Sequence, residues 1–109
     1  MNTTNTPAHG EYKIPGGKLV VVDLSVADGR IAAVQVSGDF FLEPASALDD
    51  IDAALKGLPV SASQEHLATA VTAALDPDTQ MFGISAEGVA LAVRRALASV
   101  ASEDQEATP

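Results

Sequence analysis

The stretch Lys18–Ser37, with the sequence KLVVVDLSVADGRIAAVQVS, determines the fold that we expect for this chain. Apolar residues alternate with small or polar ones on both sides of Ala27-Asp28-Gly29, a period typical of two half-buried antiparallel strands joined by a tight turn. A two-residue Asp-Gly turn would pair Val22 with Gln35, whereas a three-residue loop with Gly29 left-handed pairs Val22 with Val34. We predict the second register, because it gathers the apolar side chains on one face: Val20, Val22, Leu24, Val26, Val34 and Val36.

The other face of this hairpin is mixed in character and can face water. It carries Leu19, Val21 and Ile31 among small and polar residues, and scattered apolar side chains of this kind are ordinary on a protein surface. The turn Pro15-Gly16-Gly17 separates the hairpin from a short strand that precedes it. The predicted strands are Glu11–Ile14, Lys18–Val26 and Arg30–Ser37.

Helical periodicity replaces the strand pattern after Pro44. One helix begins near Pro44 to Ser46 and ends at Gly57, a second runs from Ser63 to Asp76-Pro77, and a third follows Ser85. The segment Asp76–Gly83 has no periodicity and is predicted to be a loop. Because the strands precede the helices instead of alternating with them, we predict an α+β fold, with a three-stranded antiparallel sheet packed on one face by about three helices.

The length and composition of the chain allow one domain. Apolar residues make up 47% of the 109 residues, which is enough for one core. Residues 1–9 and 101–109 lack apolar periodicity and are predicted to be disordered tails on a domain at residues 10–100. The initial Met1 and the two tails favour a complete small protein.

Charge and residue usage exclude several classes of function. The net charge of −9 disfavours nucleic acid and anionic membranes as partners. The absence of cysteine excludes disulfides, thiolate catalysis and cysteine-ligated metal centres. The sequence has no signal-peptide pattern and no apolar run of the roughly 20 residues that a membrane span needs. We therefore expect a soluble cytoplasmic protein.

Few residues are candidates for catalysis or metal binding. His9, in the predicted tail, and His66 have no partner at ligand spacing, so both are interpreted as ordinary polar residues. The acidic run Asp49–Asp52 follows the outside of the first helix and is interpreted as a solvated face rather than a cation site. Arg94-Arg95 is interpreted as having a capping or surface role near a helix C-terminus. We predict no catalytic residue and no metal site.

The segment Gly38-Asp39-Phe40-Phe41-Leu42-Glu43-Pro44 is the most unusual part of the sequence. Its glycine allows a sharp exit from the sheet, and its aromatics can fill the seam between sheet and helices. In extended backbone only one of Phe40 and Phe41 can point inward, so the other is a candidate anchor for a partner. Lys18, at a strand start beside two glycines, can also reach a partner, and a solvated lysine in a plain turn is the alternative.

Four stretches, in this order, resemble the accessory domain of lipoate–protein ligases: GGKLVVV at 16–22, DGRI at 28–31, SGDFFLEP at 37–44 and LxxIxxALxGL at 48–58. The resemblance runs from about Gly10 to Leu97, and GDFF with the preceding hairpin is its most specific part. In many bacterial ligases this domain is the C-terminal part of the chain, and in some organisms it is a separate small protein. Its fold also resembles that of the SufE- and NifU-like sulfur-acceptor and iron–sulfur scaffold proteins, whose function needs cysteines that are absent here.

The resemblance implies a non-catalytic accessory subunit that docks on the catalytic subunit of a lipoate–protein ligase. That partner would use ATP, Mg²⁺ and lipoate to form lipoyl-adenylate, and would then modify lipoyl-carrier domains. The accessory subunit would bind no cofactor alone and would face its partner through Lys18, Gly38, Asp39, Phe40 and Phe41. Two alternatives stay open: a stand-alone interaction or regulatory module of the same fold, and an enzyme of small acids, for which the sequence shows no convergent site. Octanoate or biotin also remains possible as the partner's acyl substrate.

Overall fold

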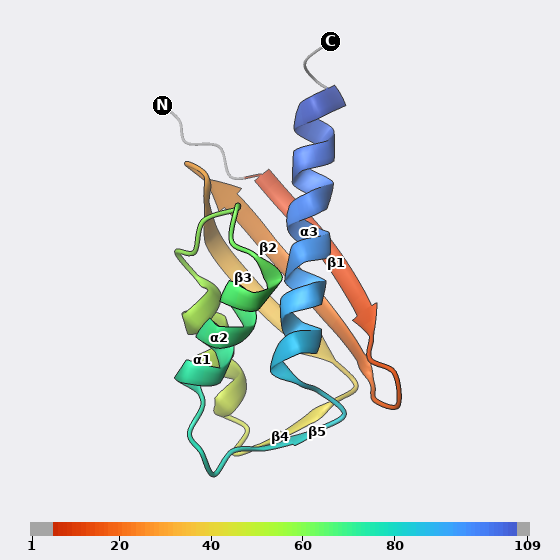
Figure 1. The fold of residues 1–109 in the computed structure, drawn as a ribbon, viewed down its shortest axis with the longest axis vertical. Coiled ribbons are helices and arrows are strands. Elements are labelled where there is room, and N and C mark those ends of the chain that lie inside the picture. The colour runs from red at the N-terminus through yellow and green to blue at the C-terminus, as the bar shows by residue number, and fades with distance from the viewer. Residues whose placement is uncertain (1–5, 107–109) are drawn as a thin grey trace.

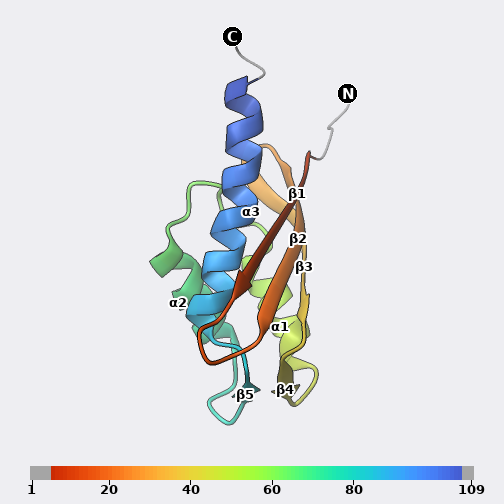
Figure 2. The ribbon, with the colours of Figure 1, turned by 90° about the vertical axis from the view of Figure 1, so that its right-hand side faces the viewer.

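The architecture is that of a two-layer α+β domain. The computed structural model describes residues 6–106. Its elements are, in chain order, β1 (Thr6–Lys13), β2 (Leu19–Ala27), β3 (Arg30–Gly38), β4 (Phe41–Glu43), α1 (Ala47–Leu55), α2 (Gln64–Ala74), β5 (Gln80–Phe82) and α3 (Ala86–Glu106). Strands β1, β2 and β3 form an antiparallel sheet in that order, and all three helices lie on one face of it (Figure 1, Figure 2). The predicted fold class is confirmed.

The core lies between the sheet and the helices. Every second residue of β2 is buried, as expected for a strand with one face toward the core. The helices contribute apolar side chains at helical spacing. The largest fully buried side chains are Val20, Val22, Ile31, Val36, Ile51, Leu55, Leu67, Val71, Val89 and Val93.

The turn between β2 and β3 is the two-residue Asp28-Gly29 turn. Both residues have positive φ, 57° and 76°, which is the requirement of a type I′ turn and suits Asp-Gly. The predicted three-residue loop is therefore wrong. The predicted pairing of Val22 with Val34 is wrong as well, because Val22 pairs with Val36.

A β-bulge in β3 restores the apolar face that the prediction required. Ala32 has no partner on β2, because its neighbours Ile31 and Ala33 pair with Val26 and Ser25. The extra residue reverses the alternation, so that Ile31, predicted on the water-facing side, is buried at 1% exposure. The apolar pattern thus needs a shift of one residue relative to a regular Asp-Gly hairpin, and the chain makes this shift in the strand instead of the turn.

Both ends of the domain extend beyond the predicted boundaries. β1 begins at Thr6 and not at Glu11, so residues 6–9 of the predicted N-terminal tail pair with β2. α3 continues to Glu106, so residues 101–106 of the predicted C-terminal tail are helical. The start of β1 gives no apolar period because small residues, Ala8 and Gly10, supply its buried positions beneath α3. Residues 1–5 and 107–109 lie outside the described part of the chain.

The outer edge of β3 is covered by the segment that contains and follows α1. The Ile31 N–H donates to the Leu58 carbonyl at 2.9 Å, and the Gly57 N–H donates to the Ile31 carbonyl at 2.8 Å. Farther along the same edge, the Val36 N–H donates to Asp52 Oδ1 at 3.1 Å. Asp52 is therefore not part of a solvated acidic face, as predicted, but half-buried, and burial raises its pKa above the usual value for an aspartate.

Candidate functional site

The candidate site is built on a two-stranded ribbon at one end of the molecule, beyond the three-stranded sheet (Figure 1). The β4–β5 ribbon pairs Phe41 with Phe82, Leu42 with Met81, and Glu43 with Gln80, in antiparallel orientation. Because side chains alternate along a strand, the first and third pairs share one face, which we call the outer face of the ribbon. Leu42 points the other way and is buried, so it anchors the ribbon to the core.

The β4–β5 ribbon carries an exposed apolar surface. Phe41 is 58% exposed, Phe82 49% and Met81 39%, and these are the exposed large apolar side chains among residues 6–99. The rings of Phe41 and Phe82 have centroids 5.9 Å apart and are tilted by 43°, an arrangement typical of a favourable aromatic pair. A cluster of this kind is characteristic of an interaction surface, because isolated apolar residues are ordinary on a surface but contiguous aromatic ones are not.

Only one of the two adjacent phenylalanines points inward, as predicted for extended backbone. Phe40 is partly buried and packs against the core, whereas Phe41 is exposed. The sharp exit from the sheet depends on Gly38, which has φ of 150°. A Cβ at this position would lie 2.1 Å from the Leu19 carbonyl oxygen and 3.0 Å from the Phe40 ring, so a side chain would not fit there.

Lys18 lies at the same end of the molecule. Its N–H donates to the Gly83 carbonyl at 2.9 Å, directly after β5. Its side chain is exposed and passes over Gly83, where a Cβ would lie 2.4 Å from Lys18 Cγ. Asp39 is exposed in the connection between β3 and β4. The structure therefore places the five predicted partner-facing residues around the β4–β5 ribbon.

The sequence prediction missed half of this surface. Met81 and Phe82 lie in the segment Asp76–Gly83, predicted to be a loop, and its residues 80–82 form β5. A shallow groove of about 470 Å³ runs along the ribbon, with Glu43, Asp78 and Gln80 among its lining residues. The available signal was the apolar pair Met-Phe inside an otherwise polar segment.

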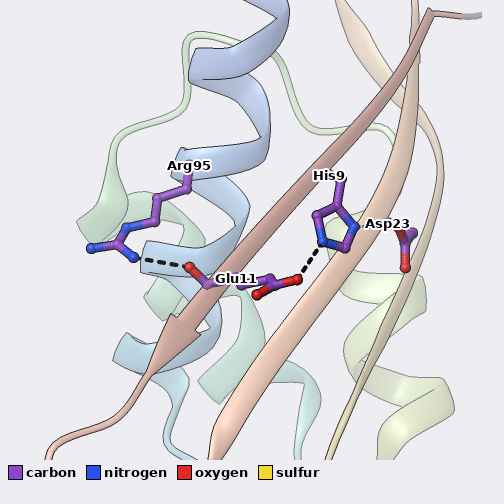
Figure 3. A network of polar contacts seen from close by, with 4 residues as sticks. All are labelled: His9, Glu11, Asp23 and Arg95. Atoms are coloured by element: carbon purple, nitrogen blue, oxygen red, sulfur yellow. Dashed lines mark hydrogen bonds and ion pairs between the residues drawn. The ribbon is translucent and has the colours of Figure 1, made fainter.

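A separate cluster of polar side chains lies on the face of the sheet opposite the three helices, which we call the open face (Figure 2, Figure 3). His9 Nδ1 lies 2.6 Å from Asp23 Oδ1, and His9 Nε2 lies 2.8 Å from Glu11 Oε2. His9 thus has two acidic partners, contrary to the prediction, which placed it in a tail. The hydrogen bond with Asp23, and then that with Glu11, raises the pKa of His9.

The His9 cluster does not form a metal site. The two carboxylates lie on opposite sides of the imidazole ring, so their oxygens do not converge with a ring nitrogen on one point. Within the described residues, no three His, Cys, Asp or Glu side chains are placed to hold a metal ion. All three side chains are about half exposed or more, so the cluster is in contact with solvent.

The two adjacent arginines of α3 both bond to backbone carbonyls of other elements, and neither caps the helix, which continues to Glu106. Arg95 has the predicted surface position, whereas Arg94 is partly buried. Arg94 Nη1 donates to the carbonyls of Val60 and Ala62, at 2.9 and 3.1 Å, and so attaches α3 to the segment before α2. Arg95 Nη1 donates to the Glu11 carbonyl at 3.0 Å on the edge strand β1 (Figure 3). The Arg95 guanidinium also lies 5.1 Å from the centre of the Tyr12 ring.

A groove larger than the one along the ribbon lies between α2 and the start of α3. It measures about 910 Å³ and is lined by small and polar residues, including Thr69, Thr72 and Ser85, with Glu65 and Glu87. Ser85 Oγ accepts a hydrogen bond from the Gly88 N–H, as expected at a helix start. The lining contains no basic side chain to pair with its two carboxylates and no cysteine or histidine. No helix in the described part of the chain is long and apolar enough to cross a membrane.

No protein-family model and no curated protein sequence matches the chain. Among solved structures, the fold is similar to a component of an archaeal lipoylation system from Thermoplasma acidophilum. That system comprises a bipartite lipoate protein ligase and its E2 lipoyl domain. The TM-score is 0.62 at 20% sequence identity, and the similarity covers 85% of this chain and 98% of that one. The protein therefore shares its fold with a small component of a lipoylation system.

Proposed function

We propose that this protein is a non-catalytic accessory subunit of a lipoate–protein ligase. It docks on a separate catalytic subunit in the cytoplasm and supports ATP-dependent formation of lipoyl-adenylate for protein lipoylation. One observation carries the proposal: the similarity of fold covers 98% of one component of a lipoylation system that comprises a bipartite lipoate protein ligase and its E2 lipoyl domain, so it extends over nearly the whole length of that component. The catalytic subunit would bind ATP, Mg²⁺ and lipoate, and this chain would bind none of them alone.

The docking residues in this proposal surround the β4–β5 ribbon. Phe41 supplies exposed aromatic surface and Lys18 an exposed cation, while Gly38 and Phe40 set the path of the chain between β3 and β4. Asp39 is exposed beside them. Exposed aromatic groups are the usual anchors of protein–protein interfaces, which is why this end is preferred over the polar groove between α2 and α3.

The physical role of such a subunit follows from the chemistry of an acyl-adenylate. This intermediate is hydrolysed when water reaches it, so a second protein that closes over the site raises its yield. A small domain that binds through one end and carries no catalytic group fits that task. The proposal therefore predicts an effect on adenylate formation that is larger than the effect on transfer from a preformed adenylate.

The test uses a lipoate–protein ligase of the same genome that lacks an accessory domain. Lipoyl-adenylate formation is measured with and without this protein, and complex formation is followed by gel filtration. We expect a stable complex and at least a tenfold increase in the rate of adenylate formation, which corresponds to about 1.4 kcal/mol of barrier. If the rate of adenylate formation is the same with and without this protein, and no complex forms, the proposal is rejected and a stand-alone interaction module of the same fold is favoured.

A further inference from the structure

We infer that the outer face of the β4–β5 ribbon binds a partner segment that carries an apolar side chain and a lysine or arginine about 7 Å apart, the span of two strand residues. The identity of the partner, the catalytic subunit of a lipoate–protein ligase, rests on the proposed function. The inference adds Phe82, Glu43 and Asp78 to the docking surface and states what chemistry they recognise.

The apolar half of this surface is the pair Phe41 and Phe82. Their rings contact each other across the ribbon and together present the most exposed large apolar side chains of residues 6–99. The ribbon is held from behind by buried Leu42, so the rings lie on a supported strand pair rather than on a free loop. Rigid aromatic side chains lose little conformational entropy on binding and are enriched among the residues that dominate binding energy.

The charged half of this surface begins at the next residue pair on the outer face, two residues along each strand from the phenylalanines. Glu43 pairs with Gln80 there, and Asp78 joins them in the lining of the groove beside the ribbon. Glu43 and Asp78 are both exposed, and the groove lining contains no basic residue. A cation on the partner that entered this groove would therefore meet two carboxylates and no basic side chain in the lining, and exposed pairs of this kind accelerate association and make it sensitive to salt.

The same charges argue against a second copy of this chain as the occupant. Two copies that met through their ribbons would bring four carboxylates together, on molecules that each carry a net charge of −9. The apolar pair alone would favour such a dimer, and the acidic groove opposes it. The surface is suited to a basic and apolar partner segment, not to itself.

The experiment measures the dissociation constant of the complex with the catalytic subunit by titration calorimetry at low and high salt. The apolar variant is Phe41→Ser with Phe82→Ser, and each single change is measured as well. The charge variant is Glu43→Lys with Asp78→Lys. Val21→Ser on the open face is the control for the single apolar changes. Glu65→Lys with Glu87→Lys, at the groove between α2 and α3, is the control for the charge variant because it changes the net charge by the same amount. Thermal unfolding verifies that every variant is folded.

We expect the apolar variant to weaken binding about 30-fold or more, the loss typical of a dominant interface residue. The charge variant should weaken binding about tenfold at low salt and much less at high salt, since screening removes its effect. Both controls should bind as the unchanged protein does. The free protein should sediment as a monomer.

The possible failures are distinguishable. Absence of any complex with the unchanged protein would reject the proposed function and, with it, the partner named here. A complex that binds the apolar variant with unchanged affinity, or loses affinity with Val21→Ser instead, would reject the ribbon as the docking surface and leave the proposed function standing. Tighter binding by the charge variant would reject the basic partner segment. A dimer of the free protein that the apolar variant abolishes would assign the surface to a second copy.

Discussion

His9 shows how a single residue can make this fold sensitive to pH. Its imidazole bridges a carboxylate on its own strand, Glu11, and one on the neighbouring strand, Asp23 (Figure 3). When the ring is protonated both nitrogens donate, and each carboxylate has a partner. When it is neutral, one nitrogen presents a lone pair to a carboxylate oxygen. The sequence did not reveal this bridge, because it depends on the pairing of β1 with β2, which begins before the predicted strand.

Protonation of His9 should stabilise the folded state. Folding raises the pKa of His9, so the protonated ring adds to the free energy of unfolding. This stabilisation is fully present below the pKa of His9 in the unfolded chain, about 6.5, and is lost as the pH rises through its pKa in the folded protein. We expect Asp23→Asn to lower the His9 midpoint, followed by NMR of the ring protons, more than Glu11→Gln does, since the bond to Asp23 is the larger cause. A midpoint that moves with neither variant, or more with Glu11→Gln, would contradict this assignment.

At the scale of elements, the packing of α3 against β1 depends on small residues. A Cβ on Gly10 would lie 2.4 Å from the Ala92 carbonyl oxygen and 2.5 Å from the Ala96 nitrogen. The obstacle is therefore the helix backbone, which cannot turn aside as a side chain can. This close approach accounts for the lack of an apolar period at the start of β1, and so for the wrong prediction of a tail there.

Gly10→Ala should therefore displace α3 and lower the free energy of unfolding by about 1–3 kcal/mol, the usual cost of overpacking a core. Chemical denaturation measures the change. The double variant Gly10→Ala with Ala96→Gly serves as the control, because removal of the Ala96 methyl group leaves the backbone atoms in place. Recovery of stability in the double variant would show that side-chain crowding, and not backbone contact, sets the distance between α3 and β1.

Elements with a local signal were predictable, and elements formed by distant pairing were not. Ser63 caps α2 through a bond from the His66 N–H, and α2 ends just before Asp76-Pro77, as the local rules require. β5, by contrast, has three residues and no alternation to detect, and it exists because β4 pairs with it. The site was accordingly half predictable: Phe41 stood out in the sequence, and its cross-strand neighbour Phe82 did not.

At the scale of the whole molecule, three surfaces of residues 6–106 are compared as candidates for binding a partner: the ribbon end, the open face of the sheet and the groove between α2 and α3. They differ in chemistry. The open face combines Leu19 and Val21, both only partly exposed, with the charged His9 cluster, and the groove is lined by small, polar and acidic residues. The ribbon end alone among these three surfaces carries large, strongly exposed apolar side chains. Binding through it would leave the other two surfaces free.

Hydrogen exchange of the whole chain discriminates among these surfaces. In the free protein we expect β4 and β5 to exchange faster than β2, because a two-stranded exposed ribbon opens more readily than a central strand. Bound to the catalytic subunit, the segments 38–45 and 76–85 should exchange at least tenfold more slowly, while the open-face segments 19–25 and 33–37 should not change. Protection confined to the open face would instead mean that the protein docks through its sheet and that the exposed phenylalanines serve another partner. Because exchange is measured along the whole chain without substitution, this outcome does not depend on any variant being folded.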